Sequence, residues 1–264
     1  MGMFFDLYES SFNISDSRLF LFSVLVVMAL SLAAALLSAV LRRVFPIRTP
    51  GTMVATMLTG ILLPTGMVVA FVASDVWHNE EKGRAAVETE AAALSDVQRA
   101  ARYLDPASRE KVNKLVDKYV HLVADSEWPE MGKGTSLPAV DEVIEELAVL
   151  AAGVGLQSDA SKREAIAAKE LGNYVSRVEH ARDSRLRIAE IRVRLPKWLA
   201  VFIMLFVSAC VIAELHLAHP RTLIVSLLLF SLAFGVTVFL IAAYDRPFTG
   251  KTIIEPTPLY KVLQ

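Results

Sequence analysis

The side chains that could bind a metal ion are few and scattered along this chain of 264 residues. Among its five histidines, only His216 and His219 lie close together, and Glu214 precedes them. Imidazole and carboxylate groups are typical zinc ligands, but a zinc site needs three or four ligands that further hydrogen bonds hold in place. No fourth ligand follows here, so we expect no metal site and interpret these residues as a polar loop.

A run of carboxylates is the second candidate for chemistry, at Asp141, Glu142, Glu145 and Glu146. The run lacks the glycine and the alternating oxygen ligands of a calcium-binding loop, which indicates an exposed helix face instead. The sequence also has no glycine-rich phosphate loop, no nucleophile elbow and no HExxH helix. We therefore predict that the protein is not an enzyme and uses no cofactor. Its net charge of −1 also argues against a nucleic-acid partner.

Four apolar runs dominate the sequence, of which 54% is hydrophobic. A helix of about 20 apolar residues crosses the hydrocarbon core of a bilayer. The runs that reach or approach this length are Leu19–Leu41, Thr52–Ser74, Trp198–Ala213 (extended by Leu215 and Leu217) and Thr222–Tyr244. The second run contains Gly60, Pro64 and Gly66, which predicts a kink. We predict an all-α membrane protein with four transmembrane helices in two hairpins.

A charged segment separates the two hairpins, and its apolar residues recur every three or four positions, as in amphipathic helices. We predict a helical insert with an aspartate–proline break after its first helix, a loop at Pro129 and from Gly132 to Pro138, and a possible bend at Gly172. The expected helices are Glu80–Leu104, Pro106–Ser126, Pro138–Ala152 and Ser161–Leu195. The predicted domains are 1–76 with spans 1 and 2, 77–196 as the insert, 197–245 with spans 3 and 4, and 246–264 as a C-terminal tail.

The distribution of basic residues near the ends of the spans predicts the orientation in the membrane. Six of them precede the third span: Arg182, Arg185, Arg187, Arg192, Arg194 and Lys197. Three lie in the opposite loop: Arg42, Arg43 and Arg48. The majority places the insert and both termini in the cytoplasm. The N-terminus has no basic region or cleavage site of a signal peptide, so we expect the first span to be retained.

The second span carries a stripe of mostly small or hydroxyl side chains, at Thr52, Thr56, Thr59, Leu63, Gly66, Ala70 and Ala73. Such a stripe allows two helices to approach closely in lipid, which is its commoner use. Alternatively, it faces a water-lined path on the axis of an oligomer. Asp75, Glu80 and Glu81 would then lie at the inner mouth of the path.

Three separated motifs resemble a bacterial bestrophin-like membrane protein family that is catalogued as a domain of unknown function. The first motif is Phe71–Val87, followed by Glu90; the second ends in Glu127-Trp128-Pro129; the third is Asp245–Gly250. The resemblance covers roughly Gly60 to Pro256. Its motif residues are Trp77, Asn79, Glu80, Arg84, Glu90, Trp128, Asp245, Pro247, Phe248 and Gly250.

This resemblance implies a distant similarity to bestrophins, which are pentameric anion channels with a pore lined by the second span. By that likeness the protein is a homo-oligomer in the inner (plasma) membrane of a bacterium, surrounded by lipid, and conducts small inorganic anions. The implied pore-lining residues are Thr52, Thr56, Thr59, Leu63, Met67 and Ala70. The positions of the hydrophobic neck fall on Thr59, Leu63 and Met67, of which one is polar and none is aromatic. No acidic pattern matches the calcium clasp of animal bestrophins.

Each motif residue also has a purely structural interpretation. Trp77 is an interfacial anchor, and Arg84 pairs with Glu80 or Glu88 four residues away. Pro247 and Phe248 attach the tail to the insert. A second class of function therefore stays open, a non-conducting membrane scaffold or sensor whose helical insert binds a protein partner.

Overall fold

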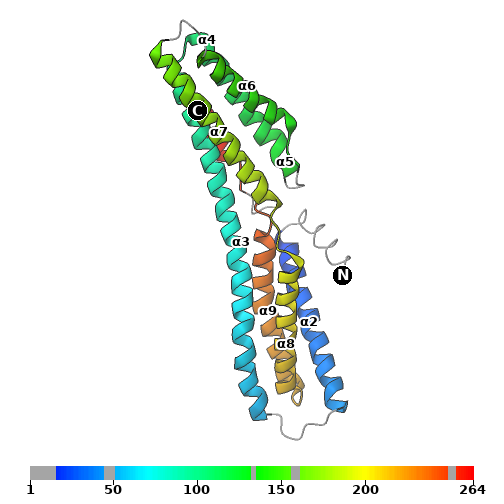
Figure 1. Ribbon diagram of the computed structural model, residues 1–264. Coiled ribbons are helices and arrows are strands. Elements are labelled where there is room, and N and C mark those ends of the chain that lie inside the picture. Colours follow the sequence, from blue (N-terminus) through cyan, green and yellow to red (C-terminus); the bar gives the residue numbers. More distant parts are fainter. Residues whose placement is uncertain (1–15, 45–50, 132–134, 156–160, 249–253) are drawn as a thin grey trace. The chain divides into compact units, whose positions relative to one another are not determined.

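The computed structural model describes residues 16–44, 51–131, 135–155, 161–248 and 254–264, without the side chains of residues 16 and 51–55. Every regular element in these ranges is helical, as the sequence predicts (Figure 1). The long helices are α2 (Asp16–Val44), α3 (Gly51–Ala101), α4 (Pro106–His121), α6 (Pro138–Gly155), α7 (Lys162–Glu190), α8 (Leu195–His216) and α9 (Pro220–Tyr244). The short ones are the π-helix η1 (Leu122–Glu127), α5 (Trp128–Met131), α10 (Thr257–Tyr260) and the 3₁₀-helix η2 (Lys261–Leu263).

Contacts divide the described residues into two compact units. The described part of the membrane unit is residues 16–44, 51–78 and 192–245, and that of the insert unit is residues 79–131, 135–155, 161–191, 246–248 and 254–264. Helix α3 contributes its first part to the membrane unit and the rest to the insert unit. The second span and the first insert helix are therefore one helix of 51 residues, which continues through Pro64.

The membrane unit consists of four apolar helices, and among the described residues four helices are long and apolar enough to span a membrane. Hydroxyl pairs hold them together, since Thr65 lies 2.9 Å from Ser208 and Ser231 donates to Ser31 over 3.0 Å. Such pairs satisfy polar groups where no water is available. A Cβ on Gly235 of α9 would lie 2.8 Å from the backbone Cα of Val24, so α2 and α9 approach closely.

Two predicted helix boundaries were wrong, both near a proline. Helix α7 ends at Glu190 rather than at Leu195, because Pro196 fits the first turn of the next helix and not a helix interior. Pro129 lies in α5, which directly continues α4 and the π-helix η1, and not in a loop. Gly172 does not interrupt α7. The N-cap Ser161 is confirmed, since it forms a capping box with Glu164.

The insert unit has one continuous apolar core formed by α3, α4, α6, α7 and the C-terminal segment. Its members recur at helical spacing on each element, which is why the amphipathic pattern predicted these helices. The largest fully buried side chain in the described residues is nevertheless a charged one, Arg185. The core is therefore built around an ionic group.

Candidate functional site

One face of α3 in the membrane unit is exposed and carries most of the predicted pore-lining residues. Leu63 is 68% exposed and Met67 is 50% exposed. Thr56, Thr59 and Ala70 are exposed as well. The side chain of Thr52 and the whole of Gly250 lie outside the described residues.

The opposite face of α3 packs inside the membrane unit. Thr65 is fully buried, and Val69, Val72 and Val76 are at most 5% exposed. At 100° per residue these four lie on the side of the helix that faces away from Leu63 and Met67. Ala73, which the sequence stripe included, is also buried, so the stripe is exposed only as far as Ala70.

The motif residues that follow the span have local partners. Arg84 binds Glu80 over 2.5 Å on the same helix, which confirms one of the two pairs expected from the sequence. Trp77 is 49% exposed. Asp75, expected at a pore mouth, lies 2.6 Å from Nζ of Lys197 within the membrane unit.

A buried ion network joins α3, η1 and α7 in the insert unit. Arg185 binds Glu90 through Nε (2.7 Å) and Nη2 (3.1 Å), and its Nη2 also donates to Glu127 over 2.9 Å. Arg182 donates to Glu127 over 2.6 Å and also binds Asp141 of α6. Asp141 is exposed. The other four charged side chains of the network are at most 3% exposed: Glu90, Glu127, Arg182 and Arg185.

Tyr119 of α4 completes the network, since its hydroxyl donates to Glu90 Oε1 over 2.8 Å. Burial and the neighbouring carboxylate of Glu90 raise the pKa of Tyr119 well above its usual value, so the phenol stays neutral. Burial alone would raise the pKa of Glu127, but the hydrogen bonds and charges of Arg182 and Arg185 lower it below its usual value. Near neutral pH the phenol of Tyr119 is thus neutral and the carboxylate of Glu127 is charged.

The C-terminal segment packs on the same region of the insert unit. Trp128 donates its indole N–H to the carbonyl of Ile254 over 3.2 Å and meets the ring of Phe248 edge-on at 5.6 Å. A Cβ on Gly83 would lie 2.9 Å from the terminal Cδ1 of Ile254 and 3.2 Å from the ring of Phe248, so both side chains pack directly on α3 at this glycine. The expected attachment of the tail through Phe248 is confirmed. Trp128 also faces the Arg185 guanidinium at 5.0 Å.

Asp245 ends α9 within the membrane unit and is 5% exposed. Its carboxylate accepts a hydrogen bond of 2.6 Å from the backbone N–H of Val193. The aspartate therefore fixes the extended residues that precede α8.

Sequence reasoning missed the role of Arg182 and Arg185, which it counted among the basic residues that set the membrane orientation. The sequence contained a signal for this role. Arg182 and Arg185 recur at helical spacing with the apolar residues Val178 and Ala189, so all four lie on one face of α7. Two arginines in an apolar stripe indicate buried ion pairs.

The prediction that Glu214, His216 and His219 form a polar loop was wrong for the first two, which lie in the last turn of α8. Glu214 lies 3.6 Å from Arg42. No group of three metal-ligating side chains occurs in the described ranges.

Comparison with known proteins gives a family and a fold. The Bestrophin-like domain family matches residues 20–259. No curated protein matches the chain. Two crystal structures of a bacterial bestrophin homologue from Klebsiella pneumoniae, each with one substitution, superpose with TM-scores of 0.68 and 0.67 at 14% and 15% identity. These alignments cover 92% of this chain and 95% and 97% of the other chains, so the same fold extends over nearly the whole protein.

Proposed function

This chain belongs to the Bestrophin-like family, and from that membership we propose that it forms a homo-oligomeric ion channel whose α3 helices line the conduction path. By analogy with bestrophins, five copies surround the path and small inorganic anions pass through it. The chain itself is an integral membrane protein with four membrane-spanning helices.

The observation that carries this proposal is the exposed face of α3 between Thr56 and Ala70. The helix is anchored in the membrane unit by its other face, through Thr65, Val69 and Val72. Rotational symmetry turns the same face of every copy toward one axis. A face that mixes hydroxyl and small side chains with Leu63 and Met67 suits such an axis, since threonine can contact water there.

Leu63 and Met67 would then form the narrowest, apolar part of the path. A hydrophobic constriction controls conduction by excluding water from a short length of a pore. Thr56 and Thr59 lie on one side of it along the helix, and Ala70 lies on the other. The gate would therefore be aliphatic.

We place the protein in the inner (plasma) membrane of a bacterium with the insert and both termini in the cytoplasm. Arg192, Arg194 and Lys197 at the start of α8 support this orientation.

Purified protein in planar bilayers tests the proposal. We expect channel currents whose reversal potential follows the chloride gradient, and a larger conductance after Leu63→Ala because the constriction widens. Leu32→Ala is the matched control, since Leu32 is 61% exposed on α2, away from α3. Oligomers that remain folded and silent would exclude the channel and favour the scaffold. A reversal potential that follows the cation gradient would retain the channel and reject anion conduction. If Leu63→Ala and Leu32→Ala changed the conductance equally, the proposal that this face of α3 lines the pore would be wrong.

A further inference from the structure

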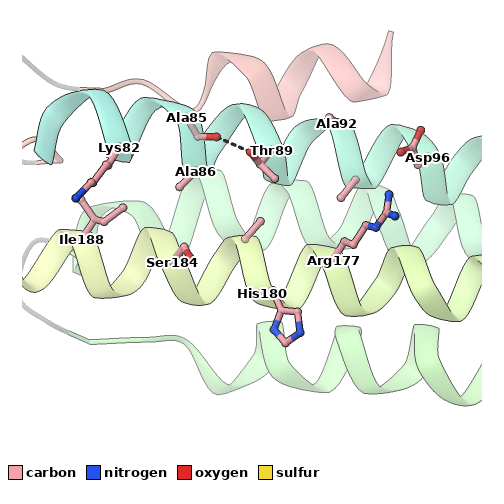
Figure 2. A pocket seen from close by; sticks show the side chains of 12 residues that line it. Lys82, Ala85, Ala86, Thr89, Ala92, Asp96, Arg177, His180, Ser184 and Ile188 are labelled. Atoms are coloured by element: carbon pink, nitrogen blue, oxygen red, sulfur yellow. Dashed lines mark hydrogen bonds between the residues drawn. The ribbon is translucent and has the colours of Figure 1, made fainter. Parts of the chain in front are cut away.

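A groove of about 600 Å³ runs along the insert unit between α3 and α7 (Figure 2). Small side chains line it, among them Ala85, Ala92 and Ala181. The hydroxyl of Thr89 is turned to its own helix, since it donates to the carbonyl of Ala85 over 2.7 Å. The groove is therefore shallow and smooth enough for another helix to approach closely.

The rim of this groove is basic. Lys82, Arg177 and His180 line it, and the one carboxylate among its lining residues, Asp96, already pairs with Arg99 over 3.1 Å. Figure 2 shows Lys82 of α3 at one end of the groove and Arg177 of α7 near the other end. His180, also on α7, lies between these two ends. An occupant of the groove should thus carry a carboxylate near the middle of its length.

The opposite flank of α3 offers such a carboxylate. Ala92 lies near the centre of the exposed face of α3, and at 100° per residue Thr89 and Lys82 fall to one side of it while Glu88 and Arg84 fall to the other. Glu88 is exposed. It directly precedes Thr89, so the two residues differ by only about 1.5 Å along the helix axis. Glu88 is therefore level with the middle of the groove.

We propose that the groove receives α3 of the neighbouring subunit, with Glu88 of the partner subunit between Lys82, Arg177 and His180. The inference rests on the homo-oligomer proposed above and adds which surfaces meet. Rotation about an axis parallel to α3 keeps every residue at its own level, so the Glu88 flank of each copy faces the groove of the next. Such head-to-tail contacts close into a ring.

Disulfide cross-linking tests this arrangement in the full-length protein. Cys210 is the only native cysteine, so the background variant is Cys210→Ser. We expect Glu88→Cys combined with His180→Cys to give cross-linked dimers and larger species in membranes after mild oxidation, and each single variant to give none. Glu88→Cys combined with Glu179→Cys is the matched control, because Glu179 is the exposed neighbour of His180 but does not line the groove. This control pair should form no cross-links.

A charge exchange provides a second measurement. Glu88→Lys should release monomers in detergent, and the further change Arg177→Glu should restore the oligomer. Equal cross-linking of both cysteine pairs, or no rescue by Arg177→Glu, would overturn the docking surface.

The mass of the untreated particle separates the two proposals. Oligomers that cross-link only through other surfaces overturn this inference and leave the channel intact. A monomeric native particle overturns both. Specific cross-linking in a protein that conducts no ions supports the interface and overturns the channel.

Discussion

Buried charged side chains stabilise one arrangement of the helices in the insert unit. Arg185 and Glu90 are both fully buried, and a buried charge without its partner costs far more than the pair contributes. Glu127 bridges both arginines, while Tyr119 shares Glu90 with Arg185. The network therefore specifies one arrangement of the helices.

We expect Arg185→Met to destabilise the protein by about 3–5 kcal/mol, because Glu90 and Glu127 would stay buried and lose the hydrogen bonds of its guanidinium. Thermal unfolding in detergent measures the change. Lys114→Met is the control, since Lys114 pairs with Glu110 at 2.7 Å but is 74% exposed, and such a surface pair contributes about 0–1 kcal/mol. Similar losses in the two variants would contradict the structural role.

The same network predicts a dependence on acid. The pKa of Glu127 is lower in the folded protein than its ordinary value of 4.5, so its ionisation favours folding above that pH. This contribution disappears as the pH falls through the lowered pKa. We expect the difference in melting temperature between wild type and Glu127→Gln to be largest near neutral pH and to shrink below about pH 4.5. A difference that stays constant with pH would exclude Glu127 as its source.

At the scale of the element, the close contact between α2 and α9 in the membrane unit depends on Gly235, which has no side chain. Gly235→Ala would place a Cβ 2.8 Å from the Cα of Val24, and because this atom belongs to the backbone, α2 and α9 must separate. We expect a loss of about 1–3 kcal/mol in stability, measured by thermal unfolding. Gly172→Ala in α7 has no atom within 4 Å of its Cβ and should gain up to about 1 kcal/mol from helix propensity. A neutral Gly235→Ala would show that the helices are not packed this closely.

The sequence predicted which segments are helices better than where they end. Apolar spacing identified the spans and insert helices, since a buried stripe must recur at the helical period. The boundary at Pro196 failed because this proline suits the first turn of α8. The boundary at Pro129 failed because the helix continues past it, directly after the π-helical turn η1, and the sequence pattern contains no signal for that turn. The partners of Glu90 and Glu127 on α7 lie 95 and 58 residues away, and sequence periodicity contains no information on such pairings.

For the whole molecule, the proposed orientation makes a direct prediction. A reporter enzyme that is active only in the cytoplasm should be active when fused after Gln264, and one that needs the periplasm should be inactive there. A fusion in the α8–α9 connection after Leu217 should show the reverse, because α9 crosses the membrane once between these points. Activity of the periplasmic reporter at the C-terminus would invert the topology.

The candidate pore face was predictable only in part, because a stripe of small residues describes packing and exposure equally well. The structure separates the two for this chain, since Ala73 packs and Leu63 does not. Recognition of the family came from three short motifs, and Trp128 and Phe248, one from each of two of them, meet in the core of the insert unit. Their separation in the sequence hides a contact that the fold creates.

Because α3 is one unbroken helix, only certain insertions and deletions within it are compatible with the fold. Each residue inserted into or deleted from this helix rotates the part after it relative to the part before it by about 100°. A single-codon insertion between Gly83 and Glu90, both in the insert unit, would therefore turn Gly83 away from Phe248 or Glu90 away from Arg185. Changes of seven residues cost only about 20° of phase. Length variants of this family should therefore cluster at whole numbers of helical repeats in α3, while the loops vary freely.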